Sequence, residues 1–153
     1  MDSSLENRYP LDELMPLIRE SLDMGKTVKL SPRGTSMLPM LRQGRDQVRL
    51  APVPGKLHPY DLPLYQREDG HYVLHRIVKA GDTYTCVGDN QFRLEPGLRQ
   101  EQMIAVVTAV FRDGREIPVT SPGYWLYCRF WHYSRPVRYL WRRAKGWLRR
   151  SMP

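Results

Sequence analysis

Residues 62–79, LPLYQREDGHYVLHRIVK, decide the fold because they have the pattern of two β-strands joined by a tight turn. Residues 62–66 and 71–79 are rich in aliphatic, aromatic and β-branched side chains, and Glu68-Asp69-Gly70 between them is a turn sequence. Pro63 has no backbone N–H, so we expect the first strand to lie at a sheet edge or to contain a bulge. The stretch predicts an antiparallel hairpin.

More short strands are expected on both sides of this hairpin, separated by turns that contain glycine and aspartate. The most apolar is residues 103–111, and the others are 27–30, 47–50, 83–87 and 116–120. Ahead of them, residues 11–23 place apolar side chains at helical spacing. A proline is tolerated in the first turn of a helix, so this helix either starts near Met15 or kinks at Pro16. The sequence therefore predicts a mainly β fold with an N-terminal helix.

The net charge of +8 comes entirely from the C-terminal end of the chain. Residues 121–153 contain eight basic residues, no acidic residue and all four tryptophans, whereas the other 120 residues carry sixteen basic and sixteen acidic side chains. A uniformly basic nucleic-acid-binding domain is a poor description of this distribution. We expect an N-terminal helical segment at 1–24, a β domain at 25–120 and a basic aromatic tail at 121–153.

Beyond Pro136 the tail has the spacing of an amphipathic helix with a wide basic face. Its candidate membrane-binding residues are Trp141, Arg142, Arg143, Lys145, Trp147, Arg149 and Arg150. Three interpretations remain open for the tail. The tryptophans pack on the β domain, the helix binds an anionic membrane surface, or arginines and aromatics bind nucleic acid. Nucleic acid is the least favoured partner, because no recognisable nucleic-acid-binding module accompanies the tail.

Several other classes are disfavoured by short-range patterns. The longest uncharged run, residues 117–128, has 12 residues and contains two prolines and a glycine, far from the ~20 apolar residues of a spanning helix. The N-terminus opens on charged residues, which disfavours a secretory signal peptide. Cys86 and Cys128 show no metal-ligand spacing, so we expect neither a metal site nor a cofactor. A cytoplasmic protein, or one peripheral on the inner face of the membrane, is the expectation.

Three short segments contain the residue types of nucleophilic catalysis, namely residues 34–39 (GTSMLP), 73–78 (VLHRIV) and 88–90 (GDN). A serine hydroxyl needs a positioned base to remove its proton, and histidine is the side chain best suited to that task at neutral pH. A carboxylate beside the histidine would fix its tautomer. Ser36, His75 and Asp89 are ordinary turn or strand residues when each is taken alone.

Taken in order, the three segments resemble the type I signal peptidase and self-cleaving-repressor superfamily of serine peptidases. With a histidine as the base, the sequence is similar to the branch of signal peptidases found in the eukaryotic reticulum, in archaea and in spore-formers. The resemblance covers residues 25–118, and it extends to short stand-alone bacterial members that begin with a helix and lack a membrane anchor. It implies a partly open, signal-peptidase-like β-barrel.

The resemblance also implies a role for each site residue. Ser36 is the nucleophile and contributes its backbone N–H to the oxyanion hole, His75 is the general base, and Asp89 orients the histidine or supports it electrostatically. Gly34 stands where many bacterial members have a serine, which leaves Thr35 as the candidate side-chain donor. Two supporting residues complete the set. Asp46 matches a position where an acid is usual, and Arg76, facing away from His75 in a regular strand, holds a loop or a carboxylate rather than substrate.

The function expected from these residues is a serine endopeptidase that forms an acyl-enzyme. By resemblance, its substrate is an extended peptide with small residues near the cut, bound by β-addition. Substrates that fit are a leader peptide of a modified product or a membrane-bound precursor reached from inside. The alternative is a non-catalytic peptide-binding module of the same fold, associated with the membrane through its tail.

Overall fold

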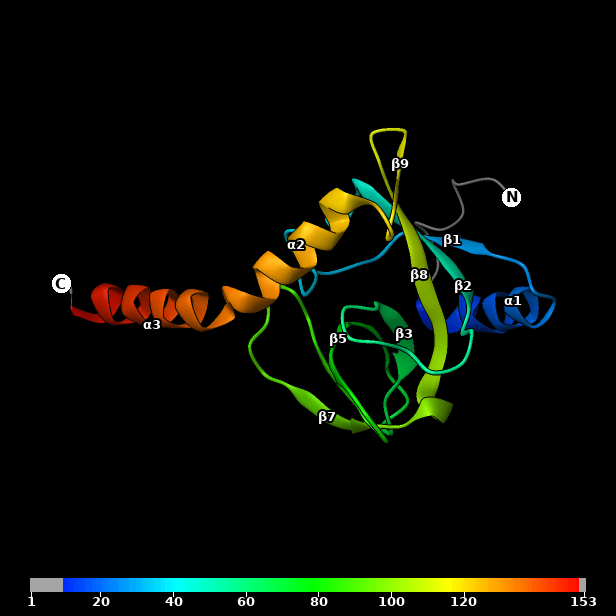
Figure 1. The fold of residues 1–153 in the computed structure, drawn as a ribbon, viewed down its shortest axis with the longest axis horizontal. Coiled ribbons are helices and arrows are strands. Elements are labelled where there is room, and N and C mark those ends of the chain that lie inside the picture. The colour runs from blue at the N-terminus through cyan, green and yellow to red at the C-terminus, as the bar shows by residue number, and fades with distance from the viewer. Residues whose placement is uncertain (1–9, 152–153) are drawn as a thin grey trace.

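Strand β8, Met103–Arg112, is the central strand of the larger sheet in the computed structural model of the chain, which describes residues 10–151 (Figure 1). This six-stranded sheet has the order β1-β2-β8-β3-β4, and β9 also pairs with β8. Every pairing is antiparallel. Its other strands are β1 (Val28–Leu30), β2 (Asp46–Pro52), β3 (Pro63–Gln66), β4 (Tyr72–Leu74) and β9 (Arg115–Pro118).

The smaller sheet has three antiparallel strands, in the order β5 (Arg76–Ala80), β6 (Tyr84–Val87) and β7 (Glu95–Leu98). The strand expected over residues 71–79 is divided at His75, where the chain leaves one sheet and enters the other. β7 was not expected from the sequence, because its Pro96-Gly97 pair is typical of a turn. A one-turn 3₁₀ helix, Gln100–Gln102, leads from β7 into β8. The mainly β prediction is confirmed, and the described strands form two sheets and no closed barrel.

The hairpin predicted from residues 62–79 is present, with Leu64 opposite Leu74 and Gln66 opposite Tyr72. Of the two alternatives expected at Pro63, an edge strand or a bulge, the edge strand is excluded because β3 lies between β4 and β8. The proline is tolerated there since it is the first residue of the strand. The expected irregularity does occur one step later, as a register shift between Leu64 and Tyr65 in the pairing with β8.

The larger sheet separates two hydrophobic clusters, because successive side chains of β8 point to opposite faces. Ala105 and Val107 join a cluster that the helices cover, whereas Val106 between them joins a cluster that includes residues of the smaller sheet. This second cluster contains the fully buried Tyr65, which lies next to the candidate base.

Helix α1, Leu11–Asp23, buries Met15, Ile18 and Leu22 in the first cluster. It begins at Leu11, so Pro16 lies inside the helix rather than at its start. The helix predicted over residues 11–23 is confirmed.

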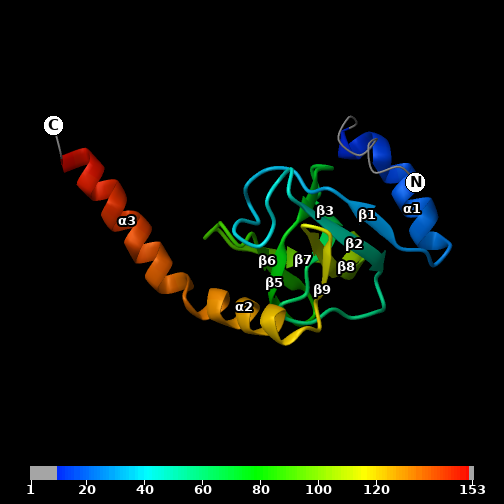
Figure 2. The same cartoon turned by 90° about the horizontal axis from the view of Figure 1, so that it is seen from above.

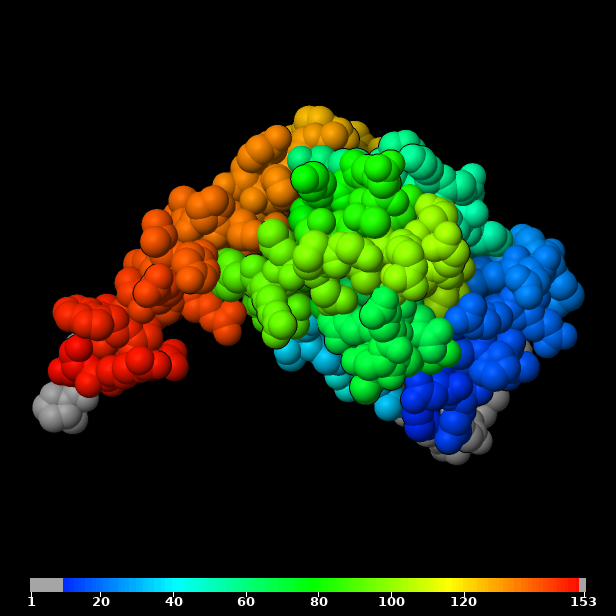
Figure 3. Space-filling view, turned by 90° about the horizontal axis from the view of Figure 1, so that it is seen from below, coloured from blue at the N-terminus to red at the C-terminus, as the bar shows by residue number. Residues whose placement is uncertain are grey.

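The C-terminal residues form two helices, which meet at a bend and differ in their burial (Figure 2). α2, Pro122–Tyr133, packs on the β domain and buries Tyr124 and Cys128, whereas α3, Arg135–Ser151, has no buried residue. Figure 3 shows the C-terminal part of α3 standing clear of the rest of the molecule, whereas Tyr139 in its first turns contacts Phe92. None of the helices within residues 10–151 combines the length and apolarity that crossing a bilayer requires.

The different burial of α2 and α3 predicts different costs for one kind of substitution. Tyr124→Ala removes a ring that is 6% exposed and should lower the free energy of unfolding by about 3–5 kcal/mol. Trp141→Ala, on α3, removes a ring that is 64% exposed and should change it by less than about 0.5 kcal/mol. Urea unfolding of the full chain measures both. Equal losses would contradict the description of α3 as a projecting helix.

Candidate active site

Ser36 lies in an irregular segment between β1 and β2 that is anchored by buried side chains on both sides of a turn. Met37 and Leu41 are both buried, and the Leu41 N–H donates to the Met37 carbonyl at 2.9 Å. Gly34 has a φ of +86°, a conformation that residues with a Cβ rarely adopt. Its N–H donates to Gln43 Oε1 at 2.8 Å. The backbone therefore favours glycine at the position where many of the bacterial peptidases that the sequence resembles have serine.

The Ser36 segment is fastened directly to the Gly88-Asp89-Asn90 turn. The Asn90 N–H donates to the Ser36 carbonyl at 2.9 Å, and the Asn90 side-chain amide donates to the Thr35 carbonyl at 3.1 Å. A Cβ added to Gly88 would lie 2.5 Å from the Ser36 carbonyl oxygen, so only glycine allows this approach. Two of the three segments singled out in the sequence are thus in contact.

His75 occupies the single position between β4 and β5 and is 5% exposed. Its Nδ1 lies 3.4 Å from the Tyr65 hydroxyl and 3.8 Å from Glu95 Oε1. Burial lowers the pKa of His75 to about 4, although the Glu95 charge acts in the opposite direction. The imidazole is therefore neutral at pH 7 and able to accept a proton.

Asp89 is fully buried and is paired with Arg76 rather than with His75. Both carboxylate oxygens accept from the Arg76 guanidinium, at 2.8 and 2.9 Å, and Oδ2 also accepts from the Tyr127 hydroxyl at 2.8 Å. The expectation that Asp89 orients His75 by direct contact is therefore wrong. The charge of Asp89 still raises the pKa of His75 from a distance, which leaves the electrostatic role. Arg76 does hold a carboxylate, as its position in the strand indicated.

The carboxylate beside His75 belongs to Glu95, a residue that sequence reasoning missed. Glu95 lies in β7, and its two oxygens accept from the Arg67 guanidinium. Burial raises its pKa, but the hydrogen bond and charge of Arg67, together with smaller effects of His75 and Tyr65, outweigh burial, so the pKa is lowered and Glu95 is ionised at neutral pH. The only sequence signal was that Glu95 is the sole acid between Asp89 and Glu101.

Of the remaining candidate residues, Thr35 lies within the Ser36 segment and Asp46 follows it. Asp46, at the start of β2, accepts from Arg45 and Arg112 and from the Arg42 backbone N–H. Burial raises its pKa, but these hydrogen bonds hold it at about 2. This ion pair ties β2 to the end of β8 and agrees with a structural role. Thr35 is exposed, and its carbonyl accepts the Asn90 contact.

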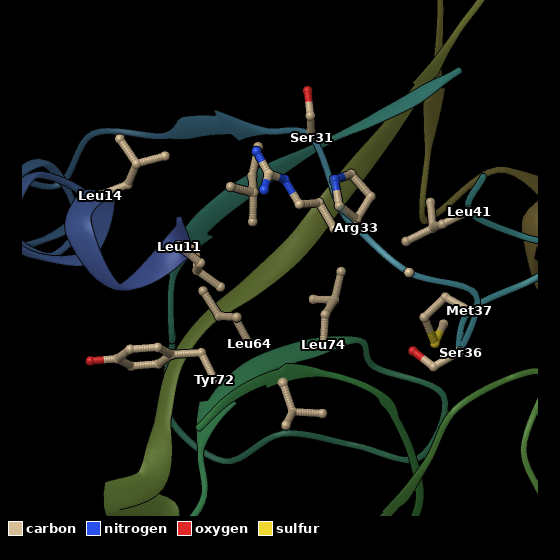
Figure 4. A pocket seen from close by; sticks show the side chains of 14 residues that line it. Leu11, Leu14, Ser31, Arg33, Ser36, Met37, Leu41, Leu64, Tyr72 and Leu74 are labelled. Carbon is tan, nitrogen blue, oxygen red and sulfur yellow. The ribbon is translucent and has the colours of Figure 1, made fainter. Parts of the chain in front are cut away.

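A pocket of about 230 Å³ extends from α1 to Ser36. One wall is the end of β1 and the segment after it, residues 30–34, and the other is β4, residues 72–74. These strands are the two edges of the larger sheet, so the pocket lies where the edges face each other. Figure 4 shows the Ser36 hydroxyl pointing into it from the end opposite Leu11 and Leu14.

The Ser36 hydroxyl lies at the end of an apolar pocket. Leu74 is in one wall of this pocket, and the next residue along the chain is His75, which is buried and neutral. In the described part of the chain no hydrogen bond joins Ser36 to His75. Catalytic hydrogen bonds are often long or poorly aligned before substrate binds, so the lack of one between Ser36 and His75 does not exclude proton transfer between them.

Comparison with protein-family models, with curated proteins and with solved structures found no match for this chain.

The titration of His75 tests the geometry around the base. We expect NMR to give His75 a pKa near 4, well below the value of about 6.5 for an exposed histidine. Because the Glu95 charge raises this pKa, Glu95→Gln should lower it further. A His75 pKa at or above 6.5, or one that rises in Glu95→Gln, would contradict the contacts described.

The buried pair predicts that Asp89 supports the fold. Asp89→Asn leaves the Arg76 guanidinium buried without an opposite charge, and should lower the free energy of unfolding by about 3–5 kcal/mol. The control, Asp82→Asn, changes an exposed turn residue and should cost less than about 0.5 kcal/mol. Urea unfolding at neutral pH compares them. A small effect at Asp89 would mean that Arg76 finds another partner.

Proposed function

We propose that the protein is a serine endopeptidase in which Ser36 attacks the peptide carbonyl and His75 acts as general base. The observation that carries the proposal is the pocket between the two sheet edges, which has the Ser36 hydroxyl at one end and Leu74, the residue before His75, in one wall. The ordered resemblance of residues 34–39, 73–78 and 88–90 to signal peptidases supports the same assignment, and with it a partly open barrel.

In the acylation step, Ser36 Oγ forms a bond to the carbonyl carbon while its proton passes to His75. A tautomer with hydrogen on Nδ1, facing Tyr65 and Glu95, leaves Nε2 as the acceptor. His75 then gives the proton to the leaving amine, and water releases the acyl group by the reverse sequence. The backbone N–H of Ser36 stabilises the oxyanion.

Glu95 supplies the negative charge that the proposed mechanism needs beside the base. When His75 becomes an imidazolium, its Nδ1 lies 3.8 Å from an ionised carboxylate, which stabilises the charged form. Arg67 holds Glu95 in place through both carboxylate oxygens. Asp89 acts on the nucleophile side, because its turn carries the hydrogen bonds to the Ser36 segment.

The substrate is an extended peptide that lies between residues 30–34 and β4. The walls adjoin β1 and β4, the edge strands of the larger sheet, and an edge strand can pair with an added strand. The pocket is lined mainly by leucines together with Met37 and Tyr72, which favours an uncharged side chain near the cut. A leader peptide or a membrane-bound precursor, reached from the cytoplasmic side, has this chemistry.

The proposal is tested with an active-site serine probe and a set of extended peptides. Ser36→Ala should abolish labelling, since the attacking oxygen is removed. His75→Gln should lower the rates of labelling and cleavage by about 10²–10⁴, the usual contribution of a general base. Mass spectrometry of the labelled protein measures both effects.

Ser21→Ala on α1 and His71→Gln in the hairpin turn are the matched controls, and both should keep wild-type rates. Equal labelling of Ser36→Ala and wild type would overturn the assignment of the nucleophile. Peptide binding without cleavage by the wild-type protein would indicate the non-catalytic binding module instead.

A further inference from the structure

An apolar stripe runs along the outer side of α2 and α3. It consists of Leu126, Phe130, Tyr133, Val137, Leu140 and Trp147, which are between 61% and 73% exposed. We call these six residues the outer stripe. Their spacing of three, four or seven places them on one side of a helix. Exposed apolar surface of this extent on a single face marks an interaction site.

The outer stripe is continuous across the junction of the two helices. The Ser134 N–H donates to the Phe130 carbonyl at 2.9 Å, and the Arg138 N–H donates to the Ser134 carbonyl at 3.0 Å. These are the i to i−4 bonds of an α-helix, so the stripe passes from α2 to α3 without changing sides.

The opposite side of α2 is already occupied by the β domain. Tyr124 and Cys128 lie in the hydrophobic core, Tyr127 donates to Asp89 and the Trp131 indole donates to the Asp89 carbonyl at 2.6 Å. Because these residues are also three or four apart, they form an inner face directed away from the outer stripe. The contact between α2 and the β domain therefore uses the inner face, and the outer stripe is a separate surface.

Positive charge borders the outer stripe on both sides. Within the described residues 121–151 there are eight basic side chains and no acidic one. At 100° per residue, Arg143 and Arg150 lie on one side of the stripe, and Arg142, Lys145 and Arg149 lie on the other. All five are exposed.

We propose that the outer stripe of α2 and α3 lies on the surface of an anionic lipid bilayer. The apolar side chains, with Trp147 and Tyr133 among them, fit the interfacial zone, and the bordering arginines and lysine fit anionic headgroups. A second copy of the chain is the weaker occupant, because it would bring two helices without acidic residues together.

This docking places the candidate active site close to the lipid. The inner face of α2 contacts Asp89, and a helix with its side chains is roughly 10 Å across, so the Ser36 segment lies about one helix diameter from the bilayer. This consequence rests on the proposed function. It means that the substrates are peptides at a membrane surface.

Sedimentation of the full-length protein with phosphatidylcholine vesicles, with and without phosphatidylglycerol, tests the docking. We expect binding to the anionic vesicles that weakens as salt is raised, and little binding to the neutral ones. Leu140→Glu and Leu126→Glu should each weaken binding at least tenfold, because each puts a carboxylate in place of a leucine that enters the lipid in the docked state. Leu17→Glu on α1, which replaces another exposed leucine, should bind like wild type.

The Leu126→Glu result separates docking of both helices from binding through α3 alone. Thermal unfolding of each variant confirms that its fold is intact. Equal binding to neutral and anionic vesicles, a loss equal in Leu17→Glu, or an unaffected Leu126→Glu would overturn the proposal. So would RNA binding or self-association without vesicle binding. Ser36→Ala should bind vesicles like wild type, so the docking and the peptidase chemistry can fail independently.

Discussion

The buried ion pair between Arg76 and Asp89 is the interaction on which the arrangement of the site depends. Arg76 begins the smaller sheet, Asp89 lies in the turn that binds the Ser36 segment, and Tyr127 of α2 donates to the same carboxylate. Arg76 also donates to the Tyr60 carbonyl and the Tyr124 hydroxyl. Both charges are fully desolvated, so neither can be removed alone without leaving the other uncompensated. One pair thereby fixes a strand, a turn and a helix relative to one another.

Much of the fold could be predicted because its signals are local. The hairpin was set by the alternation around Glu68-Asp69-Gly70, and α1 by the spacing of its apolar residues. Three features depended on distant partners. β7 forms despite Pro96-Gly97 because β6 supplies its hydrogen bonds, and Pro63 is accommodated because it opens its strand. α2 is fixed by its contacts with Arg76 and Asp89, which no local pattern reveals.

The candidate site was predictable in part for the same reason. Ser36 and His75 follow from motif and chemistry, and the structure brings the Ser36 and Asp89 segments into contact. Which acid faces the histidine is a different kind of question, because it is decided by tertiary packing. Asp89 is withdrawn from His75 by Arg76, while Glu95 is brought beside it by the pairing of β7. Nothing in the order of these residues along the chain distinguishes the two carboxylates.

His75 and Arg76 are adjacent residues with opposite surroundings, one beside Tyr65 and Glu95 and the other in the buried ion pair with Asp89. Neighbouring side chains on a strand point to opposite faces, so a shift of one residue exchanges their environments. A hairpin turn lengthened or shortened by one residue would therefore place a guanidinium beside Tyr65 and Glu95 and an imidazole beside Asp89. The length of the turn at residues 68–70 consequently determines which of the two groups stands beside Glu95, although none of its side chains contacts His75. Selection for function would act on this loop as a constraint on length rather than on identity.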